Sequence, residues 1–301
     1  MAAQITGGVD THLDVHVVAA LDGLGALVGV ESFPTTTEGC RALLGWLRSH
    51  GEVVVVGVEG TGSYGAGLAR HLQREGVAVV EVDRPNRQRR RRQGKTDPHD
   101  AVTAARATQA GDALGAAKIR DGYVEAIRVL RVVRCGAKRD RTRAINQMRS
   151  LVSTAPDDLR QQLRGLTIPK LVRRAAAFRP GGRSDIGSAT RLALRTLARR
   201  VLELDTEVAA LDEVLVPLVA ATAPELLAQV GVGTDTAGAL LVAAGENTSR
   251  LRNERSFARL CGAAPLDASS GKQQRHRLSR AGDWCTRGLV ESCSWTLMLL
   301  S

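Results

Sequence analysis

The sequence predicts an α/β domain followed by helical domains. Three observations carry this prediction. Apolar runs alternate with helical stretches over roughly the first hundred residues, Tyr123–Ser153 has the spacing of a long basic helix, and leucines then recur at heptad intervals. The 301 residues, of which 44% are apolar, suffice for two modest domains with real cores. We expect an α/β domain at 1–112, a basic helical and coiled-coil region at 113–222, and a mainly helical C-terminal domain at 223–301.

Apolar, β-branched runs mark the strands of the first domain. The expected strands are Gly8–Ala20, Gly25–Phe33, Val53–Glu59 and Val77–Val82. Helical spacing predicts helices at Thr37–His50, with Thr36 or Thr37 as its cap, at Gly65–Glu75, and after Asp97, which can cap a helix that has Pro98 in its first turn. The order is therefore hairpin, helix, strand, helix, strand, loop and helix.

Heptad spacing marks the second long helix. Apolar residues recur at alternating intervals of three and four, at Leu194, Leu197, Val201, Leu204, Val208, Leu211, Leu215 and Leu218. This pattern is typical of the a/d seam of a coiled coil. The seam can pair with a second copy of the chain, giving a homo-oligomer, or pack against Tyr123–Ser153 of the same chain, and the sequence leaves both open.

A glycine-containing turn opens the C-terminal region. The segment 226–237 resembles the hairpin of a helix-hairpin-helix unit. In such a unit Gly231 and Gly233 let backbone N–H groups approach a phosphate, and the N-terminus of the next helix attracts it. A simple connection between two helices has the same pattern.

Basic residues concentrate in the middle of the chain. From Arg84 to Arg200 there are 29 Lys and Arg against 9 Asp and Glu, a balance of +20, whereas the other residues have 13 against 22, a balance of −9. A GC-rich genome, which favours arginine codons, is an alternative explanation for the many arginines. It does not explain why the positive charge is concentrated in one third of the chain. The distribution predicts a polyanionic partner such as DNA or RNA.

Four acidic residues have the placement of a metal site. Asp10 and Glu59 stand at the ends of expected strands, and Asp97 and Asp100 are one helical turn apart. Carboxylates that converge in this way repel one another unless a hard cation lies among them. The set suits Mg²⁺, or Mn²⁺, acting on a phosphodiester. We expect the nearby His12, His16 and His99 to support the site rather than to bind the ion, because Mg²⁺ prefers oxygen.

Other features exclude several classes of protein. The five cysteines form no C-x-x-C pair, which argues against a zinc site or a disulfide framework. No run of about 18 apolar residues lacks charge, so no membrane span is expected. The N-terminus lacks the order of a signal peptide, so we expect a cytoplasmic protein.

The ordered combination of motifs is more specific than any one of them. Val9-Asp10-Thr11-His12, Val58-Glu59-Gly60-Thr61-Gly62, Lys95-Thr96-Asp97-Pro98-His99-Asp100, the coiled-coil middle, Val230-Gly231-Val232-Gly233 and Ser269-Ser270-Gly271 follow one another along the chain. This order resembles the DEDD transposases of bacterial insertion sequences, also called bridge-RNA-guided recombinases, over essentially the whole chain. The resemblance implies an RNase H-like, RuvC-like first domain and a transposase domain at the C-terminus, shortened relative to the family.

The resemblance also implies roles for residues. Asp10, Glu59, Asp97 and Asp100 match the metal-binding catalytic quartet. Ser270 matches the catalytic serine that attacks the scissile phosphodiester and holds the DNA end as a phosphoserine, with the adjacent Ser269 left as an alternative. Such a serine needs activation near neutral pH. The family brings serine and quartet together between subunits and uses a structured guide RNA that pairs with donor and target DNA, as other RNA-guided effectors do.

Several basic residues and glycines are candidates for nucleic-acid contact. They flank the acidic pair, the glycine turn or the serine, and they are Arg87, Arg89, Arg90, Arg91, Arg92, Lys95, Gly231, Gly233, Lys272, Arg275, Arg277 and Arg280.

Three other functions remain open. A RuvC-like hydrolytic nuclease has the quartet without the serine. An actin-like kinase or ATPase also carries an Asp on its first strand, but the residues after Asp10 lack the glycines of its phosphate loop. An inactive DNA-binding copy has no need of a metal.

Overall fold

The computed structural model describes residues 3–82, 97–112, 115–179, 181, 185–248, 251, 253, 258, 265–267 and 275–278. The chain divides into two compact units, one of residues 1–122 with 244–282 and the other of residues 123–243 with 283–301. We describe each unit by itself. No helix among the described residues is long and apolar enough to cross a membrane.

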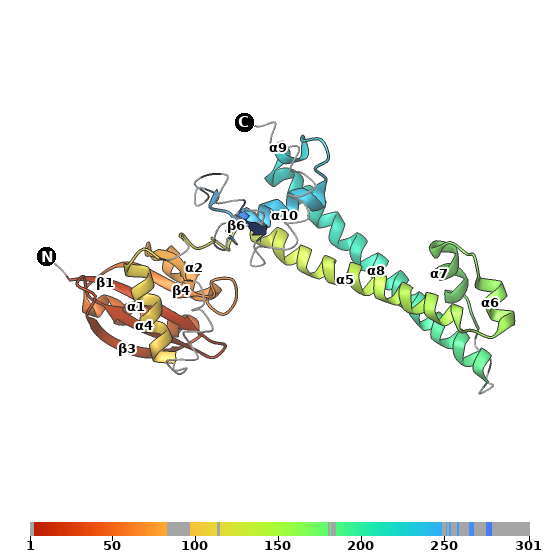
Figure 1. Ribbon diagram of the computed structural model, residues 1–301, viewed down its shortest axis with the longest axis horizontal. Helices are drawn as coiled ribbons and strands as arrows, with labels where there is room; N and C mark the ends of the chain where they lie inside the picture. The colour runs from red at the N-terminus through yellow and green to blue at the C-terminus, as the bar shows by residue number, and fades with distance from the viewer. Residues whose placement is uncertain are drawn as a thin grey trace. The chain divides into compact units, whose positions relative to one another are not determined.

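A five-stranded sheet forms the centre of the first unit (Figure 1). Its strands are β1 (Gln4–Thr11), β2 (Val15–Leu21), β3 (Leu27–Pro34), β4 (Glu52–Glu59) and β5 (Ala78–Val82). They lie in the order β3-β2-β1-β4-β5. The first three strands are antiparallel neighbours, whereas β4 runs parallel to both β1 and β5. The expected α/β character of this region is therefore present.

The sequence prediction was wrong about the first strand. The run Gly8–Ala20 forms two strands, because the backbone turns after β1, where the N–H of His12 donates to the carbonyl of Val15 across 3.1 Å. Apolar residues on both sides hid this turn from the periodicity. The turn places Asp10 next to the last residue of β1, at the edge of the sheet where β4 also ends.

Helices cover both faces of the sheet. The helices α1 (Thr37–His50) and α2 (Ala66–Arg74) share one core with β1 and β4, whereas α4 (Asp97–Gln109) packs with β2 on the other face. The hydroxyl of Thr36 caps α1 by accepting a hydrogen bond from the N–H of Gly39 at 3.0 Å, which decides between the two expected caps.

Residues from the C-terminal part of the chain also belong to the first unit. The side chain of Asn247 accepts from the N–H of Ile119 and donates to the carbonyl of Ala117. A two-stranded ribbon of β6 (Pro265–Asp267) and β7 (His276–Leu278) completes the described elements of this unit.

Two long helices form the second unit. The helices α5 (Tyr123–Ser153) and α8 (Ile186–Thr222) pack along each other. The shorter α6 (Asp157–Leu163) and α7 (Ile168–Ala176) lie at one end of the pair, and α9 (Pro224–Leu227) and α10 (Thr234–Ala244) lie at the other (Figure 1). Pro217 lies within α8, in its last two turns.

The heptad seam of α8 faces α5 of the same chain. Leu194, Val201 and Leu215 of the seam are buried, as are Ile127 and Met148 of α5. The middle seam positions are only half-buried, and these are Leu204, Val208 and Leu211. Opposite them α5 carries short or charged residues, so this stretch of the seam is incompletely covered.

Ion pairs hold α10 to the two long helices. The guanidinium of Arg134, which is 8% exposed, pairs with Asp212 of α8 and with Asp235 in the first turn of α10. Lys138 reaches the other carboxylate oxygen of Asp235 at 3.3 Å. Although burial raises the pKa of Asp235, these cations hold it below its usual value.

Candidate metal centre

Two strand ends place carboxylates side by side on one face of the sheet. Asp10 and Glu59 come directly after the last registered pair of β1 and β4, Val9 with Val58. Both side chains face α4, because alternate residues of a strand share a face and Gly8 and Gly57, two positions earlier, both contact α4. Asp10 is 4% exposed and Glu59 is 5% exposed.

The helix α4 supplies the other two carboxylates. Asp97 and Asp100 lie in its first turn at i and i+3, on the same side of the helix. Asp100 is buried and Asp97 is half-exposed. The backbone of α4 comes close to the sheet because Gly8 has no side chain. A Cβ at that position would lie 2.0 Å from the nitrogen of Ala105.

The electrostatics of Asp10 reflect this crowding of carboxylates. Burial raises the pKa of Asp10 above its ordinary value of 3.8, and the charges of Asp100 and Asp97 raise it further, while His12 acts in the opposite direction. Asp10 therefore lies close enough to both helical carboxylates for their charges to act on it. Such mutual repulsion is relieved when a cation binds among the carboxylates.

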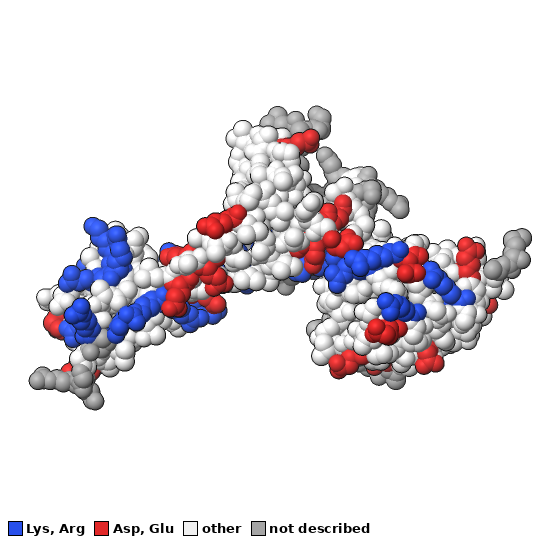
Figure 2. Space-filling model, turned by 180° about the vertical axis from the view of Figure 1, so that it is seen from behind, with Lys and Arg blue, Asp and Glu red and all other residues white. Residues whose placement is uncertain are grey.

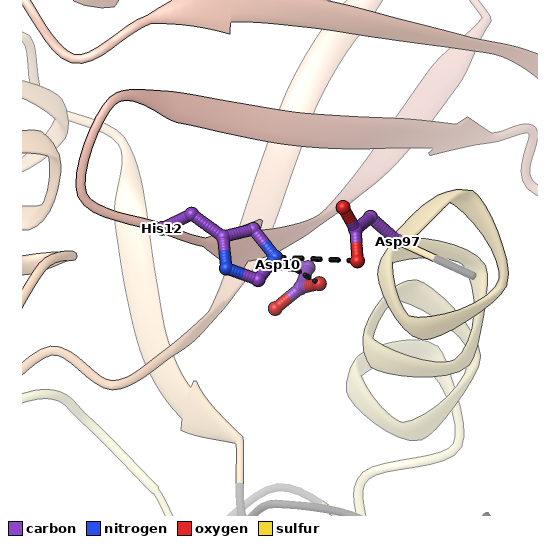
Figure 3. A group of neighbouring side chains, drawn as sticks. All are labelled: Asp10, His12 and Asp97. Carbon is purple, nitrogen blue, oxygen red and sulfur yellow. Dashed lines mark hydrogen bonds and ion pairs between the residues drawn. The ribbon is translucent and has the colours of Figure 1, made fainter. Parts of the chain in front are cut away.

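His12 lies between the strand carboxylate and the helical one (Figure 3). Its Nε2 is 3.1 Å from Oδ2 of Asp10 and 3.4 Å from Oδ1 of Asp97. One ligand atom from each of these three residues lies within 4.8 Å of the other two. The sequence predicts a supporting role for His12. His12 directly follows the last residue of β1, two positions after Asp10, and this spacing is the signal in the sequence for contact between the two side chains.

Hydrogen bonds fix the end of β4 against β1. The hydroxyl of Thr11 donates to the carbonyl of Glu59 at 2.7 Å. The chain then turns at Gly60, whose φ of 68° lies in the left-handed region that favours glycine. The N–H of Ser63 donates to the carbonyl of Gly60 and closes the turn. These contacts hold the backbone that carries Glu59 at a fixed position beside Asp10.

Comparison with known proteins identifies the family. A model of DEDD transposases of the IS110 type, described as a transposase, matches residues 7–155, and a model described as the transposase IS116/IS110/IS902 family matches residues 223–300. The chain belongs to the IS110 family of DEDD transposases. Membership gives it a transposase function, that of an enzyme acting on DNA, and implies an RNase H-like fold. No curated protein matches the chain.

The donor set fits the divalent ion that a DEDD transposase domain suggests. Carboxylate oxygens from one strand end and one helix, with an imidazole nitrogen between them, are ligands that proteins offer to divalent cations. Burial raises the pKa of Asp10, and the carboxylates of Asp100 and Asp97 act in the same direction.

The structure describes only some of the other predicted residues. Arg275 and Arg277 are exposed, at β7. Gly231 and Gly233 lie in the turn before α10, where the φ of 84° at Gly231 accounts for a glycine without any phosphate. The remaining candidates lie outside the described residues, and these are Arg87, Arg89, Arg90, Arg91, Arg92, Lys95, Ser269, Ser270, Lys272 and Arg280.

Proposed function

We propose that this transposase cleaves and rejoins DNA strands to move an insertion sequence, with a divalent ion, Mg²⁺ or Mn²⁺, held by Asp10, Glu59, Asp97 and Asp100. The observation that carries the proposal is geometric: the buried Asp10 at the end of β1 faces α4, and its carboxylate, His12 and Asp97 place ligand atoms within 4.8 Å of one another. A bound ion would polarise the scissile phosphate and stabilise the leaving oxygen.

Ser270 is the proposed nucleophile, with Ser269 as its neighbour and alternative. Its Oγ loses a proton and forms a bond to phosphorus, while the bond from phosphorus to the 3′ oxygen breaks and that oxygen takes up a proton. The DNA end then remains on the serine as a phosphodiester. Attack by a 3′ hydroxyl reverses these steps and releases the serine, so no energy of hydrolysis is lost before rejoining. The support for this assignment is the family match over residues 223–300.

A covalent adduct is the expected product when Ser270 attacks DNA. Incubation with a labelled junction of element end and flanking DNA, Mg²⁺ and the RNA from the element's end should give a protein–DNA band that survives denaturation. Ser270→Ala should reduce that band at least about 100-fold because it removes the nucleophile, whereas Ser63→Ala, an exposed serine near the carboxylates, should retain it.

Other outcomes of this experiment have defined meanings. Free cut ends without an adduct, unaffected by Ser270→Ala, would replace the proposal with a hydrolytic nuclease. If the band were lost in Ser269→Ala but retained in Ser270→Ala, Ser269 rather than Ser270 would be the nucleophile. Absence of any cutting by the wild-type protein would favour an inactive DNA-binding copy.

The basic end of the second unit is the proposed surface for nucleic-acid backbones. Figure 2 shows Lys and Arg side chains gathered at the end of the long helices that carries α6 and α7. The helix α7 buries Leu171 and Val172 and exposes Lys170, Arg173 and Arg174. Within the described part of the chain no carboxylate pairs with these three cations. Unpaired basic residues on one helix face suit phosphate contacts that carry no sequence information.

Removal of these three charges should weaken binding to nucleic acid uniformly across sequences. Lys170, Arg173 and Arg174 are changed together to Ala. The slope of the logarithm of the association constant against the logarithm of the salt concentration should fall in magnitude by about 1 per lost phosphate contact. The affinity for nucleic acid should fall about tenfold or more near 0.1 M salt. The control changes Arg41 and Arg74, exposed arginines of the first unit, to Ala. Fluorescence anisotropy over a salt series measures both. An unchanged slope in the triple variant would exclude α7 from the interface.

Self-association and a guide RNA complete the proposal. The half-buried seam positions Leu204, Val208 and Leu211 offer an apolar strip that a second copy could cover, giving a dimer or tetramer. The basic surface would serve a structured RNA as well as DNA, because both present phosphates, and base pairing would then supply the choice of target.

A further inference from the structure

The Nε2 atom of His12 lies between two carboxylates that come from different elements. A supporting histidine holds a carboxylate through a hydrogen bond and stands outside the circle of ligand atoms. Nε2 of His12 makes such a hydrogen bond to Oδ2 of Asp10 at 3.1 Å, but it also lies 3.4 Å from Oδ1 of Asp97, inside the group of possible ligand atoms that β1 and α4 present. Figure 3 shows the imidazole directed into the space between them.

The distances match those between ligands of one ion. Two ligands about 2.1 Å from an ion are about 3.0 Å apart at a right angle and about 3.4 Å apart at the tetrahedral angle. The observed separations from Nε2 are 3.1 Å to Asp10 and 3.4 Å to Asp97. The two separations from Nε2 are thus compatible with ligands of one ion, and the chosen oxygens of Asp10 and Asp97 lie within 4.8 Å of each other.

The backbone around His12 is positioned for this role. The N–H of His12 donates to the carbonyl of Val15 in the turn that joins β1 to β2. His12 is thus held in the turn two residues beyond Asp10, and its side chain reaches Asp97 of α4. A ligand on a turn fixed by a strand on each side is preorganised for binding.

We propose that His12 is a ligand of the metal ion, and that the site therefore selects a transition-metal ion such as Mn²⁺ over Mg²⁺. The inference rests on the proposed function, because it assumes that Asp10 and Asp97 hold an ion. An imidazole nitrogen adds little for Mg²⁺, which takes oxygen ligands, and adds more for first-row transition metals. Selection of the ion then depends on a residue outside the acidic quartet.

Mn²⁺ is the probe because its electron spin reports directly on bound nitrogen. In the full-length protein, electron spin-echo envelope modulation of bound Mn²⁺ should show coupling to a ¹⁴N nucleus. His12→Ala should remove that coupling, lower the affinity for Mn²⁺ about tenfold or more, and change the affinity for Mg²⁺ less than about threefold. His99→Ala is the matched control, since His99 is an exposed histidine on the first turn of α4.

Other outcomes of the Mn²⁺ experiment distinguish a failure of this inference from a failure of the proposed function. Bound Mn²⁺ without nitrogen coupling, lost in Asp10→Asn, would overturn the role of His12 and leave the metal site standing; His12 would then bridge the carboxylates as an ion pair only. If the nitrogen coupling survived in His12→Ala and disappeared in His99→Ala, His99 would be the nitrogen ligand, and the inference about His12 would be overturned. Unchanged Mn²⁺ binding in both Asp10→Asn and Asp97→Asn would refute the metal site itself.

Discussion

Replacing Asp10 with asparagine is expected to stabilise the metal-free protein and to abolish DNA cleavage. The carboxylate is buried and faces like charges, so removal of its charge removes repulsion within the folded state. The gain should be about 1 kcal/mol, or a rise in Tm of about 2–4 °C. Cleavage should fall about 1000-fold, because charge stabilisation by a metal contributes several kcal/mol and about 1.4 kcal/mol corresponds to tenfold in rate.

The pH dependence of stability follows from the direction of the shift. The pKa of Asp10 is raised in the folded protein, so the folded state binds this proton more tightly than the unfolded state does. The metal-free protein therefore loses stability as pH rises from about 4 through the raised pKa, and this contribution is absent from Asp10→Asn. The stability difference between the two proteins should vanish at acid pH, where Asp10 is protonated in both states.

Thermal unfolding with and without Mn²⁺ measures both effects. The wild-type protein should gain stability from Mn²⁺, since the ion binds only the folded form, and Asp10→Asn should not. Asp22→Asn is the control, because its side-chain oxygen can still accept the hydrogen bonds from the N–H groups of Leu24 and Ala26 that close its turn. If Mn²⁺ stabilised Asp10→Asn as much as the wild-type protein, and the metal-free variant were no more stable than the wild type, a metal site at Asp10 would be contradicted.

The sequence predicted the positions of the four carboxylates better than the surroundings of any one of them. Val53–Glu59 and the helix from Asp97 formed as expected, because β-branched runs and a proline in the first turn are local signals. The turn after β1 was missed, since apolar residues on both sides of it resemble one strand. The sequence placed His12 near the quartet, but not between Asp10 and Asp97, because that position depends on the packing of α4 against β1.

The sequence also did not predict which helix covers the heptad seam of α8. A heptad gives the period of an apolar stripe, but it does not say which helix covers it. In the structure α5 covers Leu194 and Leu215 and leaves Val208 half-exposed, because α5 is small and charged where it passes this position. The choice between a partner within the chain and one outside it thus depends on residues of a different helix.

Two glycines decide how close α4 comes to the sheet, and no local pattern marks them. A Cβ at Gly57 would lie 1.8 Å from Oγ1 of Thr108, and a Cβ at Gly8 would lie 2.5 Å from the carbonyl oxygen of Ala101. Both neighbours belong to α4. The absence of a side chain at these positions sets the distance between the strand carboxylates and the helical ones.

Gly8→Ala is therefore expected to damage the metal site from a position that contacts no ion. The new Cβ would meet the backbone of Ala105 and Ala101, which cannot rotate away, so α4 must retreat by about 1.5 Å to restore ordinary contact distances. Overpacking of this kind should cost about 3 kcal/mol of stability. Because α4 carries Asp97 and Asp100, Mn²⁺ affinity should fall about tenfold or more, and cleavage about 100-fold, in the protein that remains folded.

Gly7→Ala separates the retreat of α4 from a general loss of stability. Gly7 points to the opposite face, where a Cβ would lie 3.1 Å from Cγ2 of Val56 and 3.2 Å from Cδ1 of Leu47, and these side-chain ends can move. This variant should lose about 1 kcal/mol and bind Mn²⁺ as the wild-type protein does. Calorimetric titration at a temperature where circular dichroism shows both variants folded makes the comparison. Equal Mn²⁺ affinity in the two variants would mean that the distance between α4 and β1 does not control the site.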